Sequence, residues 1–585
     1  MARAGTIVGN GGFVNRRRLL ALVTVLVLGA VSVLARSVQI SVVQNDLWVE
    51  RARKQQRQII EVPGPRGSIR TSDGYLLATS VSRVAVQVDT HLLTYPEIFV
   101  RAAAPLIGVP EGDLANRLQR GPRAVWLAQR MDREEGERIR SLAPQAVVLV
   151  PDFARAYPLG TLAAPVVGFV GREELRTVGR AGFEHQFDAF LAGEPEQYLA
   201  INDAVQRKVR LEKLHGGRRG FDHELTLNAR IQARTEAALQ AALQQHRAQG
   251  GSAIVLEAHT GRILALASLP SFDPEDPGKA RPENWRLRPV QDAYEPGSTV
   301  KPFVAAAALA SGAVRRGERF DCRHRGIEVA GRWIRDHADP GVYSLDEIIT
   351  YSANAGIIEV AERLQPEVLW GALNGFGFGR RTGLFFPGEA RGLLAEVDSW
   401  SKMSRAGIAL GQEFTVSPLQ LAAAYAAIAN GGWLLQPILV AMDPGDGVPA
   451  TEKAAIRVMD ESLARRLRSM LESVVVEGTG ELAKVPGFRT AGKTGTAQRA
   501  VRGAFDDEHH VAWFAGFLPM PDPSLVVVVA IDEPAVDDYW ASTVAAPVFA
   551  DIAQAAACLL DVTPTGLPPA PQRVASGEHA EGGAA

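Results

Sequence analysis

A serine and a lysine stand three residues apart in the run Glu295-Pro-Gly-Ser-Thr-Val-Lys-Pro-Phe303. Pro302 is tolerated only in the first turn of a helix, so the helix begins close to Ser298. Residues three apart share one face of a helix, which brings Ser298 and Lys301 together. A serine hydroxyl needs a nearby base, and a buried lysine of lowered pKa can serve as one. The spacing predicts nucleophilic catalysis, although the pair alone also occurs in solvated helices.

A second run, Tyr351-Ser-Ala-Asn354, offers a hydroxyl and an amide before another helical stretch. The Ser352 hydroxyl can relay a proton between a lysine and a leaving amine. The Asn354 amide can hold a peptide carbonyl. The plainer interpretation is an ordinary helix cap, since Ser and Asn are preferred at that position.

The third run, Thr490-Ala-Gly-Lys-Thr-Gly-Thr-Ala497, alternates like a strand and contains a glycine. Glycine inside a strand usually marks the close approach of another backbone. A substrate peptide could add to this strand through main-chain hydrogen bonds, with Lys493 opposite its carboxylate. Taken alone, the run is equally compatible with a solvated hairpin lysine.

These runs lie among strands at both ends of a region whose middle is helical. Apolar runs over 253–257 and 262–267 flank a short glycine-containing turn and predict an antiparallel hairpin. Two further strands are predicted over 511–517 and 525–531, with helices over 229–245, 305–311 and 419–430. The pattern predicts an α/β (α+β) fold with an antiparallel sheet between helices.

The N-terminus carries three arginines at 16–18, followed by an apolar run over 19–35. A single membrane span over 19–43 follows if Arg36 lies at the interface. The arginines predict that residues 1–18 are cytoplasmic and that the rest lies outside the cytoplasmic (inner) membrane, in the periplasm or beyond. The alternative is a cleaved signal peptide, because Val33-Leu-Ala35 offers small residues to a peptidase.

Composition narrows the classes of partner. A length of 585 residues predicts two or more domains, and a formal net charge of −2 gives no reason to expect nucleic-acid binding. Cys322 and Cys558 are expected to be free, buried thiols, with a disulfide between them as the alternative. Adjacent His509 and His510 lack the spacing of a zinc site, so we expect neither a metal nor a cofactor.

The order Ser-x-x-Lys, Ser-x-Asn, Lys-Thr-Gly is the signature of penicillin-binding proteins and serine β-lactamases. From the anchor to about residue 562, the chain resembles the class B penicillin-binding proteins, the monofunctional peptidoglycan D,D-transpeptidases. Further runs support the resemblance: Arg66-Gly-Ser-Ile69, Arg155-Ala-Tyr-Pro158, Gly182-Phe-Glu184, Pro270-Ser-Phe-Asp-Pro274 and Phe386-Pro-Gly-Glu389. The runs at 531–534 and 544–549 favour the cell-division, or septal, branch.

The resemblance implies an elongated pedestal (dimerisation-type) domain over 46–219, a transpeptidase domain over 220–562 and a disordered tail over 563–585. Three runs depart from the family pattern: Arg70-Thr-Ser-Asp-Gly74, Gly411-Gln-Glu413 and Tyr539-Trp-Ala-Ser-Thr543. None of them touches the three motifs.

The resemblance also implies an acyl-transfer cycle. Ser298, deprotonated with help from Lys301, attacks the carbonyl between two terminal D-alanines, and its own N–H and that of Thr496 form the oxyanion hole. Ser352 and Lys493 pass the proton to the departing D-alanine. The remaining site residues bind the stem peptide: Asn354, and then Thr494, Gly495 and Thr496, of which the threonines hold the terminal carboxylate.

The implied partners are peptidoglycan stem peptides, as D-alanyl-D-alanine donor and amine acceptor, and β-lactam antibiotics that trap Ser298. A separate membrane glycosyltransferase and division-complex proteins are also implied, because residues 46–219 show no glycosyltransferase signature. One alternative is a D,D-carboxypeptidase or β-lactamase-type hydrolase, in which water accepts the acyl group. The other is a β-lactam sensor or a non-catalytic division scaffold.

Overall fold

The computed structural model describes residues 16–122, 124–173, 176–202, 208–441, 455–501, 504–535 and 539–566. Most of the tail expected to be disordered lies outside these residues. The chain divides into two compact units, the first made of Met1–Val62 and Pro195–Arg218 and the second of Pro63–Glu194 and Arg219–Ala585.

The first unit holds the apolar N-terminal helix. Helix α1 (Arg16–Val38) continues through a π-helical turn (Gln39–Val43). None of its side chains is buried, and by length and composition it could cross a membrane. A second helix and a three-stranded antiparallel sheet in the order β1-β8-β9 complete the unit: α2 (Asn45–Gln56), β1 (Arg57–Val62), β8 (Glu196–Asn202) and β9 (Lys208–His215).

The N-terminal part of the second unit is built on a mixed sheet in the order β10-β2-β3-β4, with β5 also paired to β3. Its strands are β2 (Ile69–Arg70), β3 (Leu76–Asp89), β4 (Ala124–Met131), β5 (Val147–Ala156) and β10 (His223–Glu224). Helices and a hairpin surround it: α3 (Pro96–Ile107), α4 (Glu111–Arg120), α5 (Arg133–Leu142), α6 (Ala164–Val167), β6 (Val170–Glu173), β7 (Arg176–Gly179), α7 (Gly182–Gln186) and α8 (Asp188–Leu191).

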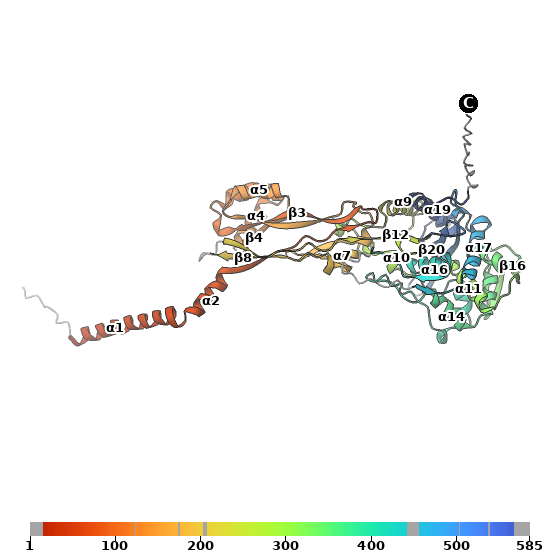
Figure 1. The fold of residues 1–585 in the computed structure, drawn as a ribbon, viewed down its shortest axis with the longest axis horizontal. Coiled ribbons are helices and arrows are strands. Elements are labelled where there is room, and N and C mark those ends of the chain that lie inside the picture. The colour runs from red at the N-terminus through yellow and green to blue at the C-terminus, as the bar shows by residue number, and fades with distance from the viewer. Residues whose placement is uncertain are drawn as a thin grey trace, which may run out of the picture. The chain divides into compact units, whose positions relative to one another are not determined.

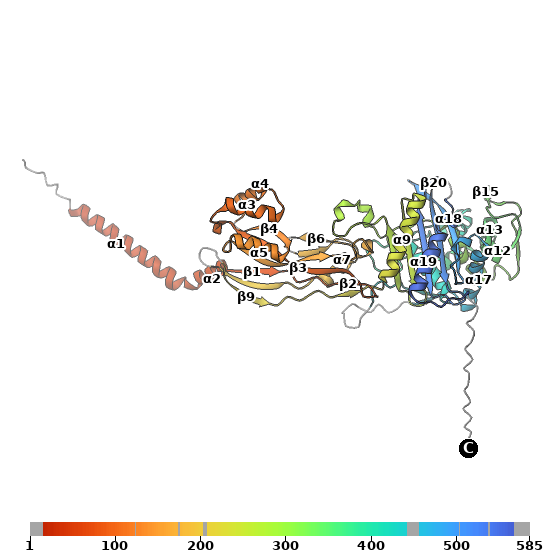
Figure 2. The same cartoon turned by 90° about the horizontal axis from the view of Figure 1, so that it is seen from above.

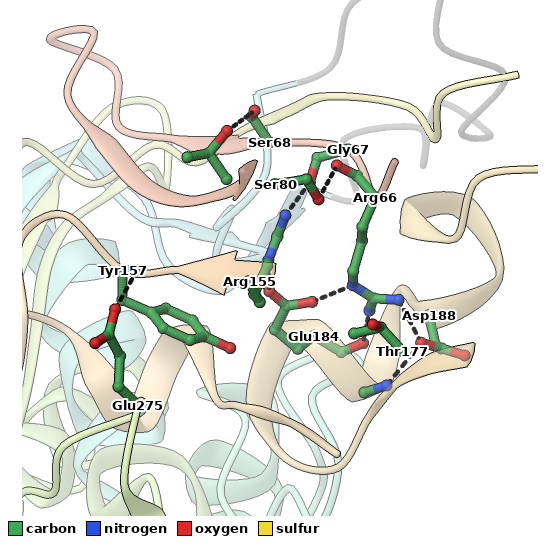
Figure 3. A network of polar contacts seen from close by, with 12 residues as sticks. Arg66, Gly67, Ser68, Ser80, Arg155, Tyr157, Thr177, Glu184, Asp188 and Glu275 are labelled. Atoms are coloured by element: carbon green, nitrogen blue, oxygen red, sulfur yellow. Dashed lines mark hydrogen bonds and ion pairs between the residues drawn. The ribbon is translucent and has the colours of Figure 1, made fainter. Parts of the chain in front are cut away.

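A buried ion network joins three runs that are far apart in this part of the sequence (Figure 3). The Glu184 carboxylate has no exposed surface and accepts hydrogen bonds from Arg66 and, at 2.6 Å, from Arg155 Nε. Arg66 Nη1 also reaches Asp188 Oδ1 at 2.6 Å, and Arg155 Nη1 donates to Gly67 O at 2.7 Å. Because each buried charge has an opposite charge beside it, the network holds α7 and α8 against β5 and the start of β2.

A five-stranded antiparallel sheet in the order β12-β11-β21-β20-β19 forms the centre of the C-terminal part. Its strands are β11 (Gly250–Glu257), β12 (Ile263–Leu269), β19 (Ala491–Val501), β20 (Ala504–Leu518) and β21 (Leu525–Asp532). β11 and β12 are the predicted hairpin, paired from Gly251–Leu269 to Leu256–Ile263. Within the part of the chain that the structure describes, β19 pairs only with β20, so its other edge is open.

Helices cover both faces of this sheet (Figures 1 and 2). Helices α9 (Ala229–His246) and α19 (Ala546–Leu559) pack on one face, where Leu239 and Ile552 share a buried cluster with Val527. Helices α11 (Lys301–Ser311) and α16 (Pro418–Ala429) lie on the other face with Val528. The predicted antiparallel sheet between helices is therefore confirmed.

Smaller elements complete the C-terminal part. The helices are α10 (Arg288–Gln291), α12 (Leu345–Tyr351), α13 (Asn354–Glu362), α14 (Pro366–Gly375), α15 (Ser404–Ala409), α17 (Glu461–Glu477) and α18 (Ala541–Val544). The short strands are β13 (Arg319–Asp321), β14 (Gly326–Val329), β15 (Arg332–Arg335), β16 (Val342–Ser344), β17 (Trp433–Leu435) and β18 (Ala455–Arg457). Cys322 is buried and free as expected, but Cys558 is exposed because it lies off the buried stripe of α19.

Candidate active site

Ser298 lies in a 3₁₀ turn (Gly297–Val300) that leads directly into α11. The α-helix was predicted to begin close to Ser298, and it begins at Lys301, one turn later. Pro302 occupies the first turn of α11 as expected. This turn is held by a hydrogen bond to the residue just before it and by one from α16. Thr299 Oγ1 donates to Pro296 O at 2.7 Å, and Tyr425 Oη donates to Thr299 O at 2.9 Å.

Lys301 is fully buried at the start of α11, and its ammonium group points to the second motif. Its Nζ lies 2.7 Å from Ser352 O, 3.2 Å from Ser352 Oγ and 2.7 Å from Asn354 Oδ1. Burial lowers the pKa of Lys301 to about 7, against an opposing effect of the Asp336 carboxylate. A substantial neutral fraction is therefore present near neutral pH, as a general base requires.

Ser352 and Asn354 lie at the junction of α12 and α13. Ser352 ends α12 in the left-handed conformation, with φ +61°, and Asn354 is the first residue of α13. The residue that precedes α13 is Ala353, which makes no side-chain cap. The ordinary helix-cap interpretation of this run is therefore wrong, because both polar side chains are arranged around the Lys301 ammonium instead.

Lys493 is fully buried on β19 rather than solvated in a hairpin. Its Nζ lies 3.3 Å from Thr494 O, 3.4 Å from Thr494 Oγ1 and 3.5 Å from Thr479 Oγ1. Burial, with a smaller effect from the charge of Lys301, lowers the pKa of Lys493 well below its ordinary value. Two lysines with lowered pKa values thus face one site.

Glycines allow three backbone segments to meet at the nucleophile. A Cβ at Gly495 would lie 2.7 Å from Pro296 O and 3.0 Å from Thr299 N. Gly411, at φ +77°, lies against the other side of the turn, where a Cβ would be 2.1 Å from Gly297 O. The close approach that the glycine of the third motif predicts is real, but the approaching backbone is the protein's own Ser298 turn.

The three motifs line one cleft of about 570 Å³. The residues that it shares with the sequence prediction are Ser298, Ser352, Asn354, Thr494, Gly495 and Thr496. Lys301 and Lys493 lie beneath it. Thr496 Oγ1 accepts a hydrogen bond from Ala541 N at 3.1 Å, which ties β19 to α18.

Aromatic side chains form a wall of the same cleft that the motifs do not predict. His510 stacks on Tyr539 with ring centroids 3.9 Å apart, and His337 meets Trp540 edge-on at 5.3 Å. In the sequence, the departure from the family pattern at 539–543 was the signal that could have pointed to this aromatic wall. Thr479 was missed altogether, because a lone threonine carries no pattern until the fold brings it to Lys493.

Comparison with known proteins gives the family. A model of the penicillin binding protein transpeptidase domain matches residues 251–554, and one of the penicillin-binding protein dimerisation domain matches 61–222. The chain is 31% identical over 564 residues to the probable peptidoglycan D,D-transpeptidase PenA of Neisseria meningitidis, which covers 94% of each chain. The chain belongs to the class B penicillin-binding proteins.

Other relatives of this penicillin-binding protein agree. The peptidoglycan D,D-transpeptidase FtsI of Escherichia coli is 29% identical over 542 residues, 91% of this chain and 90% of FtsI. Penicillin binding protein 3 of Mycobacterium tuberculosis, solved with aztreonam, has a TM-score of 0.67 at 27% identity over 87% of this chain and 99% of that one. Penicillin Binding Protein 2X of Streptococcus thermophilus shares the fold, with a TM-score of 0.73 at 21% identity over 87% and 81% of the two chains. The protein is thus a peptidoglycan D,D-transpeptidase, a serine acyltransferase, and its apolar helix α1 fits membrane anchoring.

Proposed function

We propose that this penicillin-binding protein cross-links peptidoglycan stem peptides through an acyl-Ser298 intermediate during septal wall synthesis. The observation that carries the proposal is the pair of fully buried lysines, Lys301 and Lys493, set beneath the cleft that Ser298 lines. Burial lowers the pKa of both lysines, to about 7 for Lys301, so Lys301 can act as a base near neutral pH.

In the acylation step, neutral Lys301 takes the Ser298 proton and Oγ attacks the carbonyl of the penultimate D-alanine. The N–H groups of Ser298 and Thr496 stabilise the oxyanion. When the amide bond breaks, the proton that Lys301 took from Ser298 passes through the Ser352 hydroxyl, assisted by Lys493, to the nitrogen of the terminal D-alanine, which leaves as a free amino acid. The acyl group remains on Ser298 as an ester.

The donor peptide would lie along the open edge of β19. Main-chain groups of this edge strand are available to an added strand, which is how many sheets bind extended peptides. Asn354 would hold the stem peptide, and Thr494, Gly495 and Thr496 would bind its carboxylate end. β-Lactams, which imitate D-alanyl-D-alanine, would acylate Ser298 at the same place.

An amine from a neighbouring stem peptide would then accept the acyl group. In a hydrolase, water must be activated instead by a positioned base, most often a histidine or a carboxylate. The described residues that line the cleft include His337 and His510 but no aspartate or glutamate, so product analysis must distinguish the amine from water.

We also propose the setting of the reaction. The arginines at 16–18 support a single span over 19–43 with residues 1–18 in the cytoplasm and both domains, 46–219 and 220–562, outside the cytoplasmic membrane. Glycan polymerisation would come from a separate membrane glycosyltransferase within the division complex. The similarity to FtsI and the septal-type runs near the C-terminus support the septal role.

The first test is covalent labelling with a fluorescent penicillin. Wild type should be labelled, Ser298→Ala should not, and Ser311→Ala, at the far end of α11, should label like wild type. A folded wild-type protein that takes no label would refute the acyl-serine chemistry and favour a scaffold. Product analysis with stem peptides then separates cross-linked dimers from hydrolysed peptides that have lost only the terminal D-alanine. A fluorescent fusion that fails to gather at the division site would overturn the septal assignment.

A further inference from the structure

An aspartate outside the three motifs is bound to the second of them. Asp336 follows β15, and its two carboxylate oxygens accept hydrogen bonds from Asn354 N and Ala355 N, each at 2.8 Å. The same carboxylate accepts from Ala338 N at 3.2 Å, and Asp336 N donates to Arg325 O at 3.0 Å. The side chain is thus held in place from its own loop as well as from α13.

These contacts supply what α13 lacks. A helix begins with N–H groups that have no partner within the helix, and a capping side chain usually accepts from them. Ala353 cannot do so, and Asp336, eighteen residues before Asn354, takes its place. A carboxylate at this end also interacts favourably with the helix dipole. The cap therefore determines where Asn354, the first residue of α13, lies.

The same loop holds the Asn354 side chain. Asn354 Nδ2 donates to Arg335 O at 3.3 Å, which leaves Oδ1 directed at Lys301 Nζ, 2.7 Å away. The negative charge of Asp336 acts on Lys301 as well, since it favours the protonated form while burial favours the neutral one. One carboxylate thus influences both the geometry and the protonation of this group.

We propose that Asp336 is a positioning residue of the transpeptidase, which caps α13 and through it aligns Asn354 and Ser352 with the Lys301 ammonium. The inference rests on the proposed function, because it assigns Asp336 a role toward the same proton-transfer group. Asp336 is not among the described residues that line the cleft, so it acts through α13 and through its charge.

Other titratable groups share this region and must be separated from Asp336. Lys493 on β19 interacts with Lys301. Burial raises the pKa values of Cys322, after β13, and of Tyr343, on β16. Asp336 adds to both, and Asp339 adds more than Asp336 to the pKa of Tyr343. His337 is adjacent in the loop. Several groups can therefore contribute to the wild-type pH profile. The contribution of Asp336 is obtained by comparing the pH profiles of the variants in one buffer series.

The experiment measures the second-order rate constant of penicillin acylation from pH 5.5 to 9 for wild type and four variants. A rate constant of labelling does not depend on how much of the sample is folded, so partial misfolding does not imitate the effect. Asp336→Asn keeps the size of the side chain but removes its charge and turns an N–H₂ group toward one helix N–H. Asp336→Ala removes both the charge and the hydrogen-bonding side chain. Asp336→Glu keeps the charge at a different length, and Asp339→Asn removes an exposed charge from the same loop as the matched control.

We expect the maximal rate of Asp336→Asn and Asp336→Ala to fall by about tenfold or more, because a displaced catalytic group costs rate steeply. The acidic limb of their profiles should move to lower pH, since Lys301 loses the charge that favours its protonated form. Asp336→Glu should acylate more slowly than wild type, with the acidic limb of its pH profile unchanged. Asp339→Asn should match wild type in both the rate constant and the position of the acidic limb.

Each other outcome contradicts the inference. If wild type is labelled and Asp336→Asn has the same rate constant and pH profile, this inference alone is overturned. If Asp336→Asn is slower but the acidic limb of its pH profile does not move, the action of the charge on Lys301 is overturned. A wild-type protein without label overturns the proposed function and this inference with it.

Discussion

Gly411 provides a sharp test of how the Ser298 turn is held. Its φ of +77° lies in the left-handed region, and a Cβ there would be 2.1 Å from Gly297 O and 2.5 Å from Gly297 N and C. These are backbone atoms of the residue before Ser298, so they cannot move aside as a flexible side chain could. Gly411→Ala must therefore displace the turn.

The expected magnitude has two parts. The left-handed conformation costs an alanine about 1–2 kcal/mol of stability. Separating the Cβ from Gly297 O to an allowed contact requires a shift of about 1 Å, and a displacement of that size at a catalytic group lowers the rate by roughly 100-fold. Gly312, at φ +73°, has open space where its Cβ would be, so Gly312→Ala shares the first cost without the second.

The assay pairs thermal unfolding with the rate constant of penicillin acylation for the two alanine variants. Both should lose about 1–2 kcal/mol of stability from the backbone conformation, with a further loss at Gly411 from the displaced turn. Only Gly411→Ala should lose about 100-fold in acylation rate. Equal acylation by Gly411→Ala and Gly312→Ala would refute the argument that this contact positions the nucleophile.

Two more changes follow from the described contacts. Glu184→Gln should lower the free energy of unfolding by about 3–5 kcal/mol, because it leaves Arg66 and Arg155 buried without a full counter-charge; chemical denaturation of the ectodomain measures the loss. Thr479→Val should slow penicillin acylation by roughly tenfold, since it removes one of the hydroxyls beside Lys493.

Matched variants give these predictions their controls. Glu173→Gln breaks an exposed ion pair with Arg180 and should cost no more than about 1 kcal/mol; a Glu184→Gln protein as stable as that one would mean that the network is not stabilising. Thr161→Val alters an exposed threonine far from Lys493 in sequence and should acylate at the wild-type rate. Thr479→Val at the same rate would show that its hydroxyl does not matter to proton transfer.

Much of the fold followed from local patterns. The helix expected over 229–245 is α9, and the hairpin expected over 253–267 is β11 and β12. These succeeded because periodicity and turn chemistry act between near neighbours. The order of the five strands did not follow from such patterns, since β11 lies beside β21, far away in sequence.

The residues of the site also fall into those that the sequence could predict and those that only the fold brings together. The spacing of Ser298 and Lys301 predicted a shared turn, and the structure places Ser298 in the 3₁₀ turn that leads into α11 at Lys301. Asp336 and Thr479 carried no comparable signal, since each reaches its partner only through the fold. Gly411 is similar, as its contact with the Ser298 turn depends on how two loops pack.

By itself, the sequence determined which chemical groups are available and in what order: a serine and lysine, a serine and asparagine, and a lysine, threonine and glycine. It also determined the family, through those three motifs and the runs that accompany them. Only the tertiary structure decided that Lys301 and Lys493 are fully buried and have lowered pKa values. The physical reason is that a lysine's pKa depends on the water and charges removed from around it, and these are set by packing between segments that are distant in the chain.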